Sequence, residues 1–317
     1  MNLQLYNKYS VALKQKYGEK IYKIPINLPI SCPNRDGTCG IGGCVFCGEE
    51  GAGFENLPNQ YSVSEQIVKN ISYIGKRYGA KKFIAYFQNF TNTYMPLDKF
   101  KQYMEAALQP SIVELAISTR PDCIHENYLN ILKNIADETG IQISIELGLQ
   151  TANYHTLAKI NRGHGLAEFL DAVLRIQKYG FDICTHLILN LPWDNEVDVI
   201  ENAKILSALS ISQVKLHALY VLENTLLGQW YQKEEFSMIS VEDYIERVIC
   251  FLEYLDPNII VQRLIGRAPK EGTLFVNWDT SWWKIHNQIE EKMRLEGRYQ
   301  GRLFNYVNGS SVQKFIQ

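Results

Sequence analysis

Four of the chain's seven cysteines lie within one short glycine-rich segment, CPNRDGTCGIGGCVFCGEE, which begins at Cys32. The spacing is Cys32-x6-Cys39-x4-Cys44-x2-Cys47, and the intervening glycine and proline residues let the backbone fold closely around a bulky group. Thiolate ligands favour zinc or an iron–sulfur cluster. The pair Cys44-x2-Cys47 suits chelation of a single ion, because two intervening residues form a tight turn.

Three interpretations of this loop compete on the residues alone. A structural zinc site would use all four cysteines in a closed tetrahedron, although the usual zinc pattern has two short pairs. A dithiol redox site would use Cys44 and Cys47. A [4Fe–4S] cluster would use three of the cysteines and leave one iron open. The odd number of cysteines in a long chain argues against a secreted disulfide framework.

Composition limits the class of protein. The chain has 317 residues, 46% of them hydrophobic, which is enough for a large core. A formal net charge of -2 gives no global basic field that would call for nucleic acid. The Lys-rich N-terminus lacks the continuous apolar core of a secretory signal, and no run approaches the length of a membrane span. We expect a soluble, cytoplasmic protein.

Apolar β-rich runs alternate with helical patterns along the chain. We predict strands at 21–30, 82–88, 113–119, 142–150, 181–192 and 213–221. These runs do not alternate cleanly between apolar and polar residues, as expected for strands buried on both faces. Between them, Ser62 and Glu65 form a capping box, and glycines stand at C-terminal cap positions: Gly79, Gly140 and Gly180. Such alternation predicts βαβ units and a parallel sheet.

The predicted fold is therefore α/β, a partial (β/α)6 TIM-type barrel with extensions at both ends. We expect an N-terminal extension over 1–20, the barrel over 21–235, and a C-terminal extension of helices and a strand, packed on the barrel, over 236–317. In such folds the site lies at the C-terminal ends of the strands. The cysteine loop follows the first strand, so we expect it on that face.

The arrangement Cys32-x11-Cys44-x2-Cys47, with Phe46 inside the last pair, resembles the radical S-adenosylmethionine (radical SAM) superfamily. The long first gap resembles its elongator-like branch, which includes small stand-alone YhcC-like proteins. Further sequence motifs within residues 20–220 support the resemblance: CPNRDGT, GGCVFC, YFQNFTNTY, STRPD, ELGLQT and INRGH.

The resemblance implies an enzyme with two cofactors. A [4Fe–4S] cluster would be held by Cys32, Cys44 and Cys47, with Cys39 outside the ligand set. S-adenosyl-L-methionine (SAM) would bind the open iron. An electron from a donor such as flavodoxin or ferredoxin would then cleave SAM to a 5′-deoxyadenosyl radical.

The resemblance also implies residues that bind SAM. The turn after the second strand is Gly-rich in relatives; here only its backbone and the Thr91 hydroxyl carry over. Ser118 replaces an acid that binds the ribose, and Arg162 matches an arginine that pairs with the SAM carboxylate. A strand-end cap for Ser118, a solvated charge for Arg162 and a core position for His186 remain open. The predicted SAM-binding residues are Phe46, Gln88, Asn89, Thr91, Ser118, Gln150, Arg162 and His186.

For the substrate side we predict Lys215 and His217 as catalytic residues, with Arg120 and Asp122 as further candidates. All four lie in or beside strand ends, where they can equally support the core. Glu146 lies in an apolar strand, and a buried carboxylate needs a partner.

The resemblance points to tRNA as the partner, with the side chain of the wobble uridine as the target. Two basic clusters could hold phosphates beside aromatic rings: Lys8, Lys14, Lys16, Lys20 and Lys23 near the N-terminus, and Lys284, Lys292, Arg294, Arg298 and Arg302 near the C-terminus. Two alternatives stay open: a radical SAM enzyme that acts on a peptide or small molecule, and a non-catalytic zinc-binding nucleic-acid module.

Overall fold

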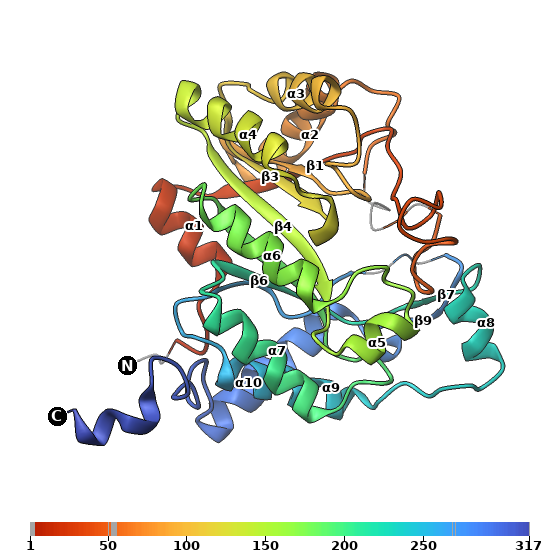
Figure 1. Cartoon of the computed structure of the whole chain (residues 1–317), viewed down its shortest axis with the longest axis vertical. Coiled ribbons are helices and arrows are strands. Elements are labelled where there is room, and N and C mark those ends of the chain that lie inside the picture. Colours follow the sequence, from red (N-terminus) through yellow and green to blue (C-terminus); the bar gives the residue numbers. More distant parts are fainter. Residues whose placement is uncertain (1–3, 50, 52–55, 268, 270, 317) are drawn as a thin grey trace. The chain divides into compact units, whose positions relative to one another are not determined.

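A computed structural model describes residues 4–49, 51, 56–267, 269 and 271–316. Its main sheet has seven strands in the order β1-β2-β3-β4-β5-β6-β8, and a second sheet pairs β7 with β9. Figure 1 shows these elements in chain order. The first six strands of the main sheet follow the chain, as successive βαβ units require. The predicted α/β partial barrel is confirmed.

The chain divides into two compact units. The first, called here the cysteine-loop unit, comprises Ser10–Leu149 and Leu157–Cys184. The second, called the C-terminal unit, comprises Met1–Tyr9, Gln150–Thr156 and Thr185–Gln317. The expected segment boundaries at residues 20 and 235 stay predictions.

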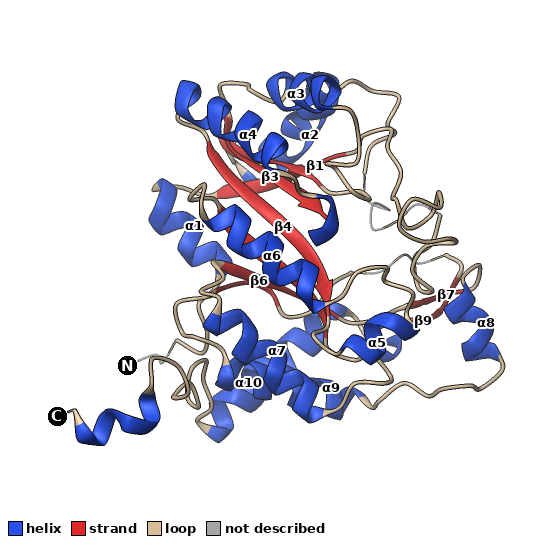
Figure 2. Ribbon diagram, viewed as in Figure 1, coloured by secondary structure: helices blue, strands red, loops and turns tan. Residues whose placement is uncertain are grey.

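The cysteine-loop unit contains most of the predicted βαβ succession. Its elements are α1 Tyr9–Tyr17, β1 Ile21–Ile26, α2 Val63–Tyr78, β2 Lys82–Phe87, α3 Leu97–Ala106, β3 Ile112–Thr119, η1 Pro121–Cys123, α4 Glu126–Thr139, β4 Gln142–Gln150 and α6 Leu166–Gln177. Figure 2 shows α2, α3 and α4 gathered beside β1, β3 and β4. Elements α5 Tyr154–Lys159 and β5 Asp182–Ile188 have residues in both units, and the first residue of α1, Tyr9, and the last residue of β4, Gln150, belong to the C-terminal unit.

The strands of this unit pair in parallel and are buried on both faces. Ile24 of β1 pairs with Ala85 of β2, and Ser118 of β3 pairs with Glu146 of β4. Apolar residues of neighbouring strands are fully buried, as are those on the inner faces of the helices: Ile24, Ile84, Leu115, Ile145, Ile67, Phe100, Met104, Leu129 and Phe169. This core explains why the strands read as apolar runs rather than as alternating patterns.

Local sequence signals fix the ends of α2. Ser62 accepts a hydrogen bond from the backbone N–H of Glu65, whose carboxylate accepts one from the backbone N–H of Ser62, so the predicted capping box is present. Gly79 ends the helix with φ of 66° and donates its N–H to Gly75. Gly140 ends α4 in the same left-handed conformation. Helix α6 instead ends at Lys178, and Gly180 adopts positive φ two residues later.

The C-terminal unit holds the remaining elements: α7 Glu196–Ala208, β6 Gln213–His217, β7 Val221–Leu222, α8 Leu226–Gln232, α9 Val241–Tyr254, β8 Ile260–Arg263, β9 Thr273–Phe275, η2 Asn277–Asp279, α10 Trp282–Glu296 and η3 Ser310–Phe315. Helix α9 packs against both α7 and α10. Among the described residues, no helix combines the length and the apolar composition that a membrane crossing requires.

Three strands are shorter than predicted. Strand β1 ends at Ile26 rather than at residue 30. There the Asn27 backbone leaves the sheet: its N–H donates to Gln66 Oε1 at 2.8 Å, and its carbonyl accepts from Gln66 Nε2 at 2.8 Å. Strand β5 ends at Ile188, and the predicted run 213–221 divides into β6 and β7. Apolar residues after each end are still buried in loops: Leu28, Leu189 and Leu219.

Candidate functional site

The cysteine loop leaves the C-terminal end of β1 and is built from tight turns. The Arg35 N–H donates to the Cys32 carbonyl at 2.9 Å, and the Cys47 N–H donates to the Cys44 carbonyl at 2.9 Å. Gly43, with φ of 79°, donates its N–H to the Asn34 carbonyl at 2.8 Å. A left-handed backbone conformation such as that of Gly43 favours glycine.

The thiols of the loop differ in exposure. Cys44 is buried, Cys32 and Cys47 are half-buried, and Cys39 is exposed. Burial raises the pKa of the Cys47 thiol, and the positive charge of Arg35 acts in the opposite direction. All seven cysteines are free thiols, as metal ligation requires.

Side-chain N–H groups point at two of the predicted ligand sulfurs. Arg35 donates to Cys47 Sγ at 3.1 Å. Arg162 donates to Cys44 Sγ at 3.5 Å, and Asn34 Nδ2 lies 3.7 Å from the same sulfur. Such donors stabilise thiolate over thiol and are a recognised influence on cluster potential. The donor set therefore fits an anionic, thiolate-ligated cluster. The sequence interpretation missed Arg35 and Asn34, which lie inside the motif without a signal of their own.

The INRGH segment docks against the cysteine loop. Asn34 Nδ2 donates to the Asn161 carbonyl at 2.6 Å, and Asn161 Nδ2 donates to the Gly43 carbonyl at 2.8 Å. The Val45 N–H donates to the Ile160 carbonyl at 3.0 Å. The cysteine loop and the INRGH segment are therefore joined by backbone and side-chain hydrogen bonds.

Arg162 is buried within this contact rather than solvated at a helix end. Its second terminal nitrogen donates to the Gly148 carbonyl at 2.7 Å. Its Nε is buried and has no hydrogen-bond partner among the described residues. A buried donor without a partner is a position where a bound polar group would fit. The predicted pairing with the SAM carboxylate stays a prediction.

The turn after β2 is predicted to face SAM. Hydrogen bonds from a side-chain amide and a backbone N–H of the turn hold it against the end of β1. Asn89 Nδ2 donates to Asn27 Oδ1 at 3.1 Å, and Gln88 donates its N–H to the Ile26 carbonyl at 3.3 Å. Phe90 adopts φ of 49°, a conformation that costs a non-glycine residue about 1 kcal/mol or more. Thr91 Oγ1 is buried and lacks a partner among the described residues. This orphan hydroxyl fits the prediction of a contact to a bound cofactor.

A polar network lies inside the sheet of the cysteine-loop unit. Ser118 Oγ donates to the Tyr86 hydroxyl at 3.1 Å. The Lys23 ammonium, 4.6 Å from the centre of the Tyr86 ring, forms an ion pair with the buried Glu146 carboxylate. Burial, followed by the charge of Glu146, raises the pKa of Tyr86 well above its ordinary value. The partner that Glu146 needs is therefore Lys23, a residue that the sequence interpretation placed in a basic cluster.

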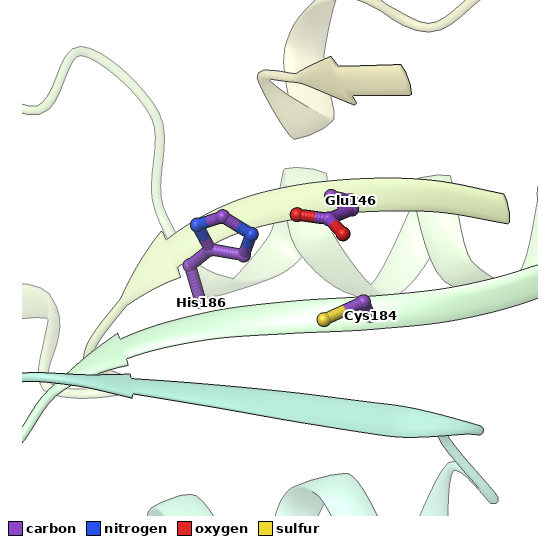
Figure 3. A group of neighbouring side chains, drawn as sticks. All are labelled: Glu146, Cys184 and His186. Carbon is purple, nitrogen blue, oxygen red and sulfur yellow. The ribbon is translucent and has the colours of Figure 1, made fainter. Parts of the chain in front are cut away.

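Figure 3 draws Glu146 of β4 with Cys184 and His186 of β5. Within the cysteine-loop unit, a Glu146 carboxylate oxygen and Cys184 Sγ lie within 4.8 Å of each other. His186 follows Cys184 by two residues, so both side chains leave the same face of β5.

In the C-terminal unit, the structure brings together the predicted residues His186 and His217. Their ring centroids lie 5.2 Å apart. Arg263 of β8, which the sequence interpretation did not name, contacts His217 Nδ1 at 2.7 Å. Lys215 is buried on the same face of β6 as His217. Gln150 adopts φ of 80°, a strained conformation at the end of β4.

Two candidates for the substrate side are engaged with each other. Arg120 donates to both carboxylate oxygens of Asp122, at 2.9 and 2.7 Å, and to the Arg162 carbonyl at 2.9 Å. Burial acts to raise the pKa of Asp122, but hydrogen bonds and charge from Arg120 outweigh it and lower the pKa. The pair supports the INRGH segment. Phe46 is half-buried in the turn between Cys44 and Cys47.

The terminal basic clusters are largely neutralised by acidic partners. Lys8 pairs with Glu290, and Lys16 pairs with Asp182 at 3.1 Å. Near the C-terminus, Lys292, Arg298 and Arg302 each contact a carboxylate of α9: Glu246 or Glu253. These clusters therefore offer less positive charge to a phosphate backbone than their sequence suggests.

Comparison with known proteins assigns the chain to a family. A family model described as the radical SAM superfamily matches residues 34–206, and a radical SAM C-terminal domain model matches residues 211–294. The chain belongs to the radical SAM superfamily. Members of this superfamily use a [4Fe–4S] cluster and SAM, and the chain is an enzyme of this class. A non-catalytic zinc module does not agree with this membership.

Relatives place the chain within the superfamily. It is 35% identical to MJ0486 of Methanocaldococcus jannaschii over 304 residues, covering 95% of this chain and 92% of that protein. It is 32% identical to YhcC of Escherichia coli over 300 residues, covering 94% of this chain and 95% of that protein. The predicted elongator-like, YhcC-like membership is confirmed.

Two further similarities are more distant. The chain is 26% identical to the tRNA uridine(34) acetyltransferase of Methanocaldococcus jannaschii over 162 residues, which cover 49% of this chain and 28% of that protein. The solved structure of archaeal Elp3 from Methanocaldococcus infernus superposes with a TM-score of 0.68 at 16% identity, covering 88% of this chain and 64% of that chain. The latter shows a shared fold.

Proposed function

We propose that this radical SAM enzyme acts on the side chain of the wobble uridine of a tRNA. The observation that carries the proposal is the similarity over half of the chain to a tRNA uridine(34) acetyltransferase. The shared fold with Elp3 is consistent with it. Because the match covers 28% of the acetyltransferase, the proposal takes over the substrate and not the acetyl transfer.

In this proposal Cys32, Cys44 and Cys47 hold the cluster, and Cys39 does not. When bound there, the cluster and SAM would supply radical chemistry that begins with removal of a hydrogen atom from the substrate. Arg35 and Arg162 stabilise the ligand thiolates through their N–H groups. The exposure of Cys39 sets it apart from the buried and half-buried ligands.

The remaining roles rest on position. We assign Thr91 and Arg162 to SAM because each has a buried polar atom without a protein partner among the described residues. Ser118, Gln88, Asn89, Phe46, Gln150 and His186 stay as predicted SAM contacts. Lys215 and His217 stay as predicted catalytic residues, with Arg263 beside His217. A one-electron donor such as flavodoxin or ferredoxin completes the proposed system.

The ligand assignment is tested by comparing two cysteine variants after anaerobic reconstitution. Cys44→Ala is expected to lose bound iron and labile sulfide and to abolish reductive cleavage of SAM to 5′-deoxyadenosine. Cys39→Ala is expected to keep about four irons per chain and its cleavage activity. The assignment is wrong if Cys39→Ala loses the cluster as completely as Cys44→Ala.

The substrate is tested by mass spectrometry of tRNA nucleosides from a strain that lacks the gene. The proposal expects a changed modification at the wobble uridine, restored by the wild-type chain and not by Cys44→Ala. An unchanged wobble-uridine profile, together with normal SAM cleavage by the purified protein, would instead favour a peptide or small molecule as the substrate.

A further inference from the structure

Helix α2 exposes large side chains on its outer face. Tyr73 is 63% exposed, Val68 is 60% exposed and Tyr78 is 45% exposed, while Val63 and Ile67 on the inner face are buried. A single exposed apolar residue is ordinary, but several on one helix face mark an interaction surface.

This outer face is also basic. Residues at helical spacing line a shallow groove of about 690 Å³: Val68, Lys69, Ser72, Tyr73, Lys76 and Arg77. The lining includes three cations and no carboxylate. Among the described residues, Lys69, Lys76 and Arg77 form no ion pair, although Glu65, one turn before Lys69, interacts with it electrostatically. The lysines and arginines of the terminal clusters, in contrast, largely face acids.

Rings and cations are already arranged together on this face. The Lys69 ammonium lies 4.6 Å from the ring centre of Tyr61, which precedes the helix. Arg77 donates to the Tyr73 hydroxyl at 2.9 Å, and its guanidinium lies 5.4 Å from the Tyr78 ring. Tyr78 stacks on Tyr22 of β1, with centroids 4.8 Å apart and an interplanar angle of 16°. These contacts hold the side chains in place and lower the entropic cost of binding.

We infer that the outer face of α2 binds a single-stranded segment of RNA, with phosphates on Lys69, Lys76 and Arg77 and a base on the Tyr73 ring. Flat exposed rings beside unpaired cations are the features that bind single strands, because every base has a face that stacks. From Lys69 to Arg77 the helix rises about 12 Å, enough for several consecutive phosphates.

The inference rests on the proposed function for its choice of RNA, and it deepens that function by naming a docking surface on the same chain. An acidic protein surface would satisfy the cations but would leave the aromatic rings without a stacking partner. An anionic membrane would meet the same charges, but it would not depend on one flat ring.

The test measures binding of the full-length, reconstituted chain to a fluorescent single-stranded oligouridine RNA across salt concentrations. Lys76→Gln/Arg77→Gln is expected to weaken binding and to reduce the slope of log affinity against log salt by about 1.4, which corresponds to two phosphate contacts on a single strand. Tyr73→Ala is expected to weaken binding about fivefold or more with an unchanged salt slope. The matched control is Lys99→Gln/Lys101→Gln, which removes two exposed charges from α3 and is expected to bind normally.

Three results would overturn the inference. In the first, the α2 variants bind oligouridine as the α3 control does. In the second, Tyr73→Ala has no effect while the charge variant weakens binding to anionic lipid vesicles equally, which indicates a surface for anions in general. In the third, α2 variants lose binding only to an acidic peptide probe. Because binding is read separately from SAM cleavage and nucleoside analysis, failure here leaves the proposed function standing, and failure of the proposed function shows in those two assays.

Discussion

At the scale of single residues, Arg35 is the most informative side chain near the predicted cluster. Its guanidinium donates to Cys47 Sγ at 3.1 Å and to the Cys47 carbonyl at 3.1 Å, and it lies over the Phe90 ring at 5.2 Å. One side chain therefore braces the turn that ends at Cys47 and places a positive charge beside a predicted ligand sulfur.

Replacing Arg35 should change the reduction potential. The reduced cluster carries more negative charge, so a neighbouring cation stabilises it, and Arg35→Gln is expected to lower the midpoint potential by tens of millivolts. A shift of about 59 mV corresponds to a tenfold change for one electron. An electron paramagnetic resonance titration of the reconstituted protein measures it. Arg162→Gln should shift the potential in the same direction but less, since its contact to Cys44 is longer at 3.5 Å. Unchanged potentials in both variants, with full iron content, would contradict this role.

Asp194 gives a prediction about pH. Burial raises its pKa from 3.8 to about 6, although Thr156 Oγ1 donates to it at 2.6 Å. An acid whose pKa is higher in the folded state holds its proton there more tightly. Stability therefore falls as pH rises from about 4 to about 6, by roughly 2–3 kcal/mol. Asp194→Asn keeps an acceptor for Thr156 and should remove this loss. Urea unfolding of both proteins is measured at pH 4.5, about half a unit above the lower end of that interval, and at pH 7, about one unit above its upper end. An equal change in stability between the two pH values in both proteins would contradict the prediction.

At the scale of elements, the ion pair between Lys23 and Glu146 links β1 to β4 across the interior of the sheet. Glu146 is buried, so removing Lys23 leaves the Glu146 carboxylate without its cationic partner. Lys23→Met is expected to destabilise the chain by about 3–5 kcal/mol at neutral pH. The double variant Lys23→Met/Glu146→Gln should recover most of this loss, because neither charge remains. Urea unfolding measures both, and equal losses in the single and double variants would show that the ion pair is not the cause.

The elements also show what sequence can predict. Strand and helix positions followed from apolar runs, and the capping box at Ser62 and Glu65 was readable because it is local. The end of β1 was not readable, because it depends on Gln66, a residue 39 positions away from Asn27. Likewise, the basic N-terminal cluster could not reveal that Lys8 and Lys23 pair with Glu290 and Glu146. Contacts between residues close in sequence can be predicted from the sequence, whereas contacts between distant segments are known only once the fold is known.

At the scale of the whole molecule, binding of SAM should increase the free energy of unfolding of the reconstituted chain. A ligand that binds only the folded state stabilises it in proportion to the logarithm of its concentration over its dissociation constant. SAM at about 100 times that constant should stabilise the reconstituted chain by about 2.7 kcal/mol and raise its melting temperature. Calorimetry measures this shift. The Cys44→Ala chain should show little of it, and an equal shift in both proteins would mean that SAM binds without the cluster.

The cysteine loop stands out in the sequence by residue type and spacing, and the family resemblance selects Cys32, Cys44 and Cys47 as the predicted ligands. The side chains around these thiols have no such signal. Asn34, Arg35 and Arg263 do not stand out, since arginines and asparagines are common on any surface. Only the fold shows which of them point at a sulfur or a histidine.

The hydrogen bonds between Asn34 and Asn161 join two parts of the chain that are 127 residues apart. During synthesis, the cysteines leave the ribosome long before residue 161 does. The hydrogen-bonded surroundings of the thiols are therefore complete only after more than half of the polypeptide has emerged. Iron and sulfide delivered to a shorter nascent chain would meet an open loop, so maturation of the metal centre belongs to a late stage of biogenesis.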